Sequence, residues 1–130
     1  MFVTKNFVKG ETIFKEGDLG DRTFHIIKGE VLICKNRRDG GMVAIGKLGV
    51  GEIFGEMYLF DPQAGGRRSA TAIAACDAEV EVIFEETLTK LMADMPPQLG
   101  SIMEALCRRL RKLSGDYAMV VPVKKYSFIN

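Results

Sequence analysis

The sequence predicts a mainly β domain with a helical C-terminus, on three observations. Twelve of the 14 glycines in the 130-residue chain fall before residue 67 and divide the first half into short pieces. Strand-like runs lie between them at a spacing of roughly ten residues, typical of an antiparallel sandwich or barrel. After Phe84 glycine almost disappears and helix-forming residues dominate. We therefore expect a single domain over residues 1–130, with a β-roll over about 5–84, helices over about 85–120 and a tail over 121–130.

Two hairpins are predicted in the first half of the chain. Residues 23–27 and 31–34 are strand-like and flank Lys28-Gly29-Glu30, a pattern that indicates a tight turn. Arg38-Asp39-Gly40-Gly41 indicates a second turn, with residues 42–45 as the returning strand. These strands would supply much of an antiparallel sheet.

The second half begins with one more strand and continues as helices. Charged and apolar residues alternate over Glu79-Val80-Glu81-Val82, so this strand is expected to have one face in water. A short helix is predicted over residues 85–92. Pro96-Pro97 suits the first turn of a second helix, which ends near residue 120 because a proline follows at position 122.

The second predicted helix carries the clearest periodic pattern in the chain. Large apolar residues recur at spacings of 4, 3, 4, 3, 4 and 3: Leu99, Met103, Leu106, Leu110, Leu113, Tyr117 and Val120. A repeat of 3.5 residues over three heptads fits packing on the domain's own barrel, and it equally fits a homodimer seam. The basic residues from Arg108 to Lys112 lie mostly off this stripe and are expected to be solvated. No segment looks like a helix-turn-helix, so direct DNA binding is not expected.

Composition and charge exclude several classes of protein. The chain is 47% hydrophobic and 27% charged, as in a globular domain, and no run approaches the ~20 apolar residues of a membrane-spanning helix. The net charge of +1 indicates no particular partner. Cys34, Cys76 and Cys107 form no Cys-x-x-Cys pair and are expected to be reduced thiols in a cytoplasmic protein. The single histidine, His25, cannot form a multi-histidine metal site.

The most informative segment lies between residues 48 and 72. A glycine-spaced approach leads into Phe54-Gly55-Glu56 and a predicted helical turn, and arginines then begin a strand of small residues. Free backbone N–H groups at such a turn attract anions, and glycine lets a ligand approach the backbone closely. An arginine in the same pocket would offer a positive fork to a phosphate. A glutamate beside it makes sense only if it faces another part of the ligand, such as a sugar hydroxyl.

This segment resembles the phosphate-binding cassette of cyclic nucleotide-binding domains, the module of catabolite activator proteins, protein kinase regulatory subunits and gated channels. The order Phe-Gly-Glu, Leu, Arg-Ser-Ala carries the resemblance, and residues 13–21 and 26–31 look like the family's first hairpins. The resemblance runs from about residue 8 to about residue 118. It implies a double-stranded β-helix (jelly roll) of about eight strands with short helices and a C-terminal capping helix.

The resemblance also implies roles for individual residues. Glu56 would accept a hydrogen bond from the ribose 2′-hydroxyl, and Arg68 would pair with the cyclic phosphate. Arg67 is the competing arginine, but the Arg-Ser-Ala order favours Arg68. Tyr58 stands where the family usually has a small residue, so its ring would point away from the pocket or crowd it. The implied ligand-binding residues, of which the last two would face the base, are Phe54, Gly55, Glu56, Met57, Tyr58, Arg68, Ser69, Ala70, Leu113 and Ser114.

The function implied by the resemblance is a regulatory sensor rather than an enzyme. It would bind a 3′,5′-cyclic nucleotide, cyclic AMP in preference to cyclic GMP, without a metal or cofactor, and signal by moving its C-terminal helix. Its other partners would be an effector domain or protein and, if the helical stripe is a seam, a second copy of the chain. Three alternatives stay open: a binding-dead module of the same fold, a Glu56–Arg68 ion pair that merely closes the barrel, and, less favoured, a cupin-like enzyme.

Overall fold

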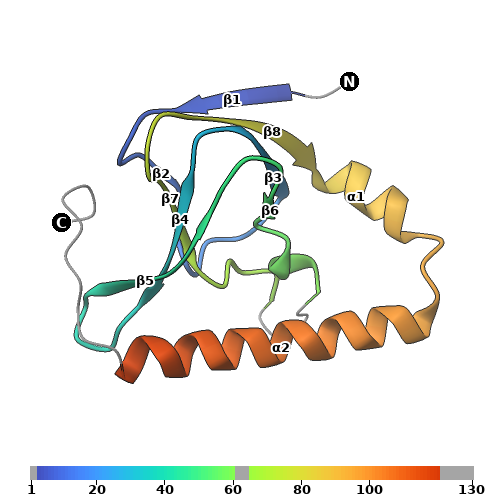
Figure 1. Cartoon of the computed structure of the whole chain (residues 1–130). Coiled ribbons are helices and arrows are strands. Elements are labelled where there is room, and N and C mark those ends of the chain that lie inside the picture. The colour runs from blue at the N-terminus through green and yellow to red at the C-terminus, as the bar shows by residue number, and fades with distance from the viewer. Residues whose placement is uncertain (1–2, 61–64, 121–130) are drawn as a thin grey trace.

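Eight strands form two four-stranded antiparallel sheets that face each other in the computed structural model, which describes residues 3–60 and 65–120 and the side chains as far as residue 115 (Figure 1). One sheet has the order β1-β8-β3-β6 and the other β2-β7-β4-β5. This architecture confirms the expected mainly β jelly roll. The strands are β1 (Val3–Phe7), β2 (Thr12–Phe14), β3 (Arg22–Lys28), β4 (Val31–Asn36), β5 (Met42–Leu48), β6 (Ile53–Phe54), β7 (Thr71–Ala74) and β8 (Ala78–Phe84).

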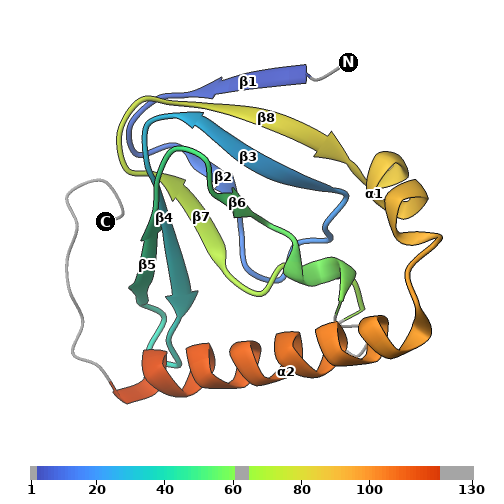
Figure 2. The same ribbon diagram turned by 45° about the vertical axis from the view of Figure 1, so that its right-hand side comes forward.

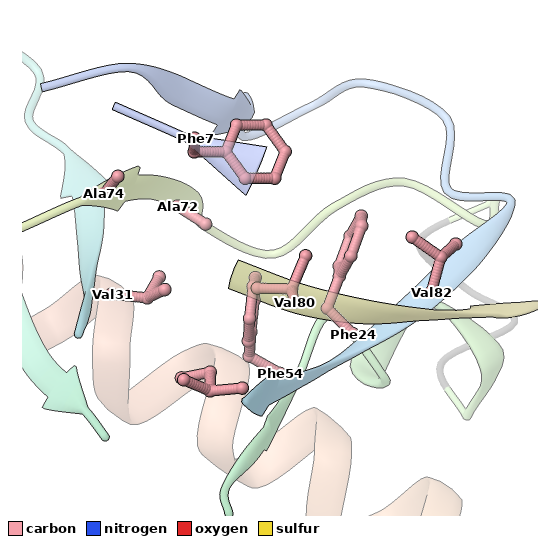
Figure 3. Close-up of a cluster of buried hydrophobic side chains, with 9 residues drawn as sticks. Phe7, Phe24, Val31, Phe54, Ala72, Ala74, Val80 and Val82 are labelled. Carbon is pink, nitrogen blue, oxygen red and sulfur yellow. The ribbon is translucent and has the colours of Figure 1, made fainter. Parts of the chain in front are cut away.

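The core lies between the two sheets, because alternate residues of each strand point inward. On β8, Val80 and Val82 are buried whereas Glu79 and Glu81 are half-buried, so the predicted alternation is confirmed. Figure 3 shows the inward-facing side chains from both sheets meeting in one cluster. The cluster consists of Phe7, Phe24, Ile26, Val31, Phe54, Ala72, Ala74, Val80 and Val82.

Of the two predicted hairpins, one is confirmed and one is wrong. β4 and β5 pair across the turn at 38–41, which is closed by a hydrogen bond from Arg37 N to Gly41 O of 2.7 Å. β3 and β4 do not pair, because β3 lies between β8 and β6 while β4 lies between β7 and β5. The turn at Gly29 instead carries the chain from one sheet to the other. Gly29 has a φ of +86°, and a Cβ there would lie 2.4 Å from Asp77 O, so this corner needs glycine.

Two α-helices follow the last strand, as predicted. α1 (Glu85–Met92) and α2 (Pro97–Val120) are joined by a short connection, and α2 crosses beneath the β4–β5 hairpin (Figures 1 and 2). A 3-10 turn, η1 (Met57–Leu59), lies between the barrel and α2 and confirms the predicted helical turn after Glu56. The tail at 121–130 lies outside the described residues. No helix in the described part of the chain is long and apolar enough to cross a membrane.

The leucines of the predicted α2 stripe are exposed. Leu99, Leu106, Leu110 and Leu113 are 46–64% exposed, whereas Met103 is half-buried, Cys107 is buried and Gly115 lies near Lys35. The side chains of Tyr117 and Val120 lie outside the described residues. Packing on the chain's own barrel therefore does not account for the stripe. Ile102, which is not one of the predicted stripe residues, is exposed beside these leucines.

The surroundings of the three cysteines and of the single histidine are those of ordinary structural residues. All three cysteines are free, as expected, and burial raises the pKa of the Cys34 thiol to about 11, so it stays protonated at neutral pH. His25 is a strand residue on β3, where its Nδ1 lies 3.5 Å from a Glu81 carboxylate oxygen. Among the described residues, no group of three or more His, Cys, Asp or Glu could hold a metal ion.

Candidate functional site

A cavity of about 110 Å³ opens where the segment around η1 meets the beginning of β7. Glu56 and Arg68, twelve positions apart in the sequence, both line it. Eight of the ten residues expected to bind ligand line this cavity, together with four residues from β2, β4, β5 and β6. The lining residues are Phe14, Ile33, Leu48, Ile53, Phe54, Gly55, Glu56, Met57, Tyr58, Arg68, Ser69 and Ala70.

Arg68 places a buried positive charge in the wall of this cavity. The residue is 5% exposed, and its Nη1 donates a hydrogen bond of 2.8 Å to Gly55 O. Its guanidinium carbon lies 4.2 Å from the centroid of the Phe14 ring and 4.9 Å from that of Tyr58, within cation–π distance. No carboxylate of the described residues forms an ion pair with it, and burial lowers the pKa of the guanidinium. The Asp21 and Asp18 carboxylates act on it only at longer range, so an anion in the cavity would supply a direct counter-charge.

Gly55 is required where Arg68 crosses the backbone. Its φ is +81°, in the left-handed region that favours glycine. A Cβ at this position would lie 2.9 Å from Arg68 Nη1 and 3.2 Å from Phe14 Cε2. The glycine therefore allows the arginine to approach the Gly55 carbonyl, and this explains the Phe-Gly-Glu pattern physically.

Glu56 lines the cavity without pairing with Arg68. No Glu56–Arg68 salt bridge occurs in the described structure, so an ion pair that closes the barrel is not the reason for these two residues. Burial raises the pKa of the Glu56 carboxyl, and its own backbone amide and the nearby Arg68 charge partly oppose this. A half-buried carboxylate of this kind gains from a hydroxyl donor in the cavity.

The Tyr58 ring forms part of the cavity wall. The ring packs on Gly20, where a Cβ would lie 2.4 Å from it, and stacks on Arg68. Because these contacts hold the ring in the wall, it does not fill the cavity. Tyr58 is 5% exposed, its buried hydroxyl has no hydrogen-bond partner among the described residues, and burial raises its pKa to about 12. The ring neither turns away from the pocket nor blocks it.

The remaining predicted residues lie elsewhere. Arg67 is exposed and donates a 2.9 Å hydrogen bond to Gly17 O, so Arg68 is the arginine in the cavity wall. Leu113 and Ser114 do not line the cavity: Leu113 is 64% exposed, and Ser114 Oγ donates to Leu110 O. The lining residues that sequence reasoning missed are Phe14, Ile33, Leu48 and Ile53.

The fold is a two-sheet jelly roll, and its cavity lies between a 3-10 turn and a strand that Arg68 precedes. These features define a small-molecule-binding β-roll. Comparison with known families makes the assignment specific: the model of the cyclic nucleotide-binding domain matches residues 4–95. The chain belongs to this family.

Relatives of known function and structure agree with the family. The chain is 31% identical over 116 residues to the CRP-like cAMP-activated global transcriptional regulator of Mycobacterium tuberculosis, covering 89% of this chain and 50% of the regulator. It is 34% identical over 111 residues to the cyclic AMP receptor protein of Thermus thermophilus, covering 85% and 50%. It thus spans about half the length of these relatives.

Solved structures show the same fold. The cAMP-bound EAL enzyme Bd1971 superposes with a TM-score of 0.77 at 32% identity, covering 85% of this chain and 29% of the enzyme. The catabolite activator protein of Thermus thermophilus superposes with a TM-score of 0.68 at 32% identity, covering 89% and 53%.

Proposed function

We propose that this domain is a regulatory sensor that binds a 3′,5′-cyclic nucleotide in the cavity between η1 and β7. The observation that carries the proposal is that Glu56 and Arg68 line one cavity without neutralising each other. Arg68 pairs with the cyclic phosphate, which gives the buried guanidinium a counter-charge. Glu56 accepts a hydrogen bond from the ribose 2′-hydroxyl.

The size of the cavity supports a movement on binding. A volume of about 110 Å³ is below the roughly 300–1,000 Å³ of most ligand pockets. A nucleotide would extend beyond this volume, and α2 is attached to the barrel with its leucines exposed. We propose that α2 shifts when ligand binds and that Leu113 and Ser114 then face the base.

Cyclic AMP is the favoured ligand over cyclic GMP. A free hydroxyl next to Arg68 could favour guanine, but Ser69 Oγ already donates a hydrogen bond to Met57 Sδ at 3.3 Å. The relatives of Mycobacterium tuberculosis and Thermus thermophilus are both named for cAMP. Both observations support adenine.

The proposed partners follow from α2 and from the length of the chain. Leu99, Leu106 and Leu113 belong to an exposed apolar stripe that suits a homodimer seam. Because the chain spans half of its curated relatives, the signal passes to an effector domain or protein outside this sequence. We propose no catalytic role and no direct DNA contact for the domain itself, and a cytoplasmic location.

Calorimetric titration of the domain with cyclic AMP, cyclic GMP and 5′-AMP tests the function. We expect saturable binding of cyclic AMP, weaker binding of cyclic GMP and little of 5′-AMP. Arg68→Ala should weaken cyclic AMP binding about ten- to a hundredfold, because a charge-assisted hydrogen bond is worth roughly 1.5–3 kcal/mol. Arg67→Ala is the matched control and should bind as the unmodified chain does. Absence of both binding heat and thermal stabilisation by cyclic AMP would identify a binding-dead module.

A further inference from the structure

Lys35 is a buried cation that contacts the backbone of the segment Arg68-Ser69-Ala70. It lies on β4 and is 7% exposed, a degree of burial that lysine tolerates only when its ammonium is paired. Its Nζ donates to the backbone carbonyl of Ser69 and lies 3.6 Å from a Glu16 carboxylate oxygen. Ser69 follows Arg68 and lines the cavity. A positive charge is thus fixed next to the proposed phosphate site without being among its lining residues.

Glu16 is itself held by the surrounding backbone. Its Oε1 accepts a 2.8 Å hydrogen bond from Asn36 N, and its own N–H donates a 2.9 Å bond to Thr71 Oγ1. The Lys35–Glu16 pair therefore ties β4 to the segment after β2 and to the first residue of β7. Such a network fixes the position of the ammonium within a narrow range.

Peptide geometry links Lys35 to the cavity. The Ser69–Ala70 peptide is trans and planar, so its C=O and its N–H point in opposite directions. A donor that fixes the Ser69 carbonyl also fixes the direction of the Ala70 amide. The ammonium further polarises the peptide group and makes that amide a stronger donor. Ala70 lines the cavity.

We propose that Lys35 is a positioning residue for the anion-binding half of the site. By holding the Ser69 carbonyl, it orients the Ala70 amide towards the ligand phosphate and adds positive potential one peptide group away. The inference rests on the proposed function for the identity of the anion. The orientation of the amide does not depend on it.

Helix α2 covers Lys35 and reaches the same segment at a second point. A Cβ at Gly115 would lie 4.0 Å from Lys35 Cε, an ordinary contact distance. One turn earlier, Arg111 Nη2 donates a 3.3 Å hydrogen bond to Arg67 O. A displacement of α2 would let water reach the ammonium and weaken its hold on Ser69. Occupation of the anion site and the position of α2 are thereby coupled.

The test uses Lys35→Met, which keeps the length of the side chain and removes the ammonium, in the full 130-residue chain. Two readouts are needed. The first is the ¹⁵N–¹H spectrum of the ligand-free protein, in which the Ala70 amide proton should move upfield more than the other amides of residues 65–72. The second is a calorimetric titration with cyclic AMP, in which affinity should fall about tenfold. Lys47→Met, which removes a lysine from the exposed Glu30 pair, is the control and should change neither readout.

The outcomes separate this inference from the proposed function. An unmoved Ala70 amide in Lys35→Met overturns the positioning role whether or not the protein binds a nucleotide. A shifted amide with unchanged cyclic AMP affinity also overturns it, because the orientation would then not serve the ligand. An unmodified chain that binds no nucleotide refutes the proposed function alone. Should Lys35→Met fail to fold, Lys35→Gln, which retains a neutral donor, is tested for an intermediate shift and an intermediate affinity.

Discussion

The barrel buries its large apolar side chains, whereas helix α2 exposes most of its own. Between the sheets, Ile26, Val31 and Val80 are fully buried. On α2, Leu110 and Leu113 are more than half exposed, and Cys107 is the only buried residue among those whose side chains are described. The buried core therefore stabilises the barrel without α2, whereas α2 is attached to the barrel by few buried side chains. A helix attached in this way can change position without unfolding the domain, as a sensor requires.

A matched pair of leucine-sized truncations tests this contrast most directly. Ile26→Ala should lower the free energy of unfolding by about 3 kcal/mol, since it removes a fully buried side chain and leaves a cavity in the core. Leu110→Ala should change it by less than about 0.5 kcal/mol, because that side chain is already in water. Urea unfolding at low protein concentration measures both.

Protein concentration then tests the homodimer proposed for α2. If the stripe forms a seam, the cost of Leu110→Ala should grow as concentration rises, while the cost of Ile26→Ala should not. Sedimentation velocity should show a dimer that Leu110→Lys dissociates. A monomer at every concentration would exclude the seam, and a large concentration-independent cost of Leu110→Ala would show that α2 packs on the barrel.

The same contrast explains which features the sequence could predict. The alternation in β8, the turn after Glu56 and the helix at 85–92 depend on local patterns, and each is found at its predicted residues. The sheet change at Gly29 was missed because a tight turn within a sheet and a corner between sheets use the same residues. Likewise, periodicity shows that α2 has an apolar face, but it cannot show which neighbour that face meets.

For the site, the cassette residues could be predicted and the supporting residues could not. The order of the motifs predicted Gly55, Glu56 and Arg68 as site residues, and all three line one cavity. Phe14 and Ile33 reach it from strands far away in sequence, and Lys35 acts through the backbone. No motif marks such residues, because their role depends on strand pairing.

The next largest effect is expected at Gly55. Gly55→Ala forces a Cβ into a backbone conformation with φ +81° and to within 2.9 Å of Arg68 Nη1. We expect a loss of about 2 kcal/mol in the free energy of unfolding, from the left-handed backbone and the displaced guanidinium. Gly40→Ala has a similar φ, +89°, but open space around the Cβ, and should lose only the backbone part. Equal losses in the two variants would show that contact with Arg68 is unimportant.

A gain of stability is expected at Tyr58. Tyr58→Phe removes a buried hydroxyl for which the described part of the chain offers no hydrogen-bond partner, and it keeps the ring packed on Gly20 and Arg68. The free energy of unfolding should rise by about 1 kcal/mol, because the desolvation cost of the hydroxyl disappears. Thermal melting measures this gain, with Tyr58→Leu as the comparison that loses the ring. A destabilised Tyr58→Phe would mean that the hydroxyl has a partner, such as a bound water.

The smallest effect is expected in the pH dependence of stability. Because burial raises the pKa of Glu56 in the folded state, the folded protein binds more protons than the unfolded chain between the ordinary carboxyl range and the raised value. The contribution of Glu56 is therefore favourable below this window and is lost as pH rises through it. Glu56→Gln should remove that loss, so its melting temperature relative to the unmodified chain should rise as the pH increases above the ordinary carboxyl range.

Binding should respond to the same substitution in the opposite direction. Glu56→Gln loses the charged acceptor for the ribose hydroxyl, so cyclic AMP affinity should fall although the ligand-free domain is more stable at neutral pH. Glu86→Gln, on the exposed face of α1, is the control and should alter neither property. Parallel losses of stability and affinity in Glu56→Gln would make Glu56 a structural residue of the barrel. Opposite changes would mean that the cavity holds a destabilising carboxylate because the ligand needs it.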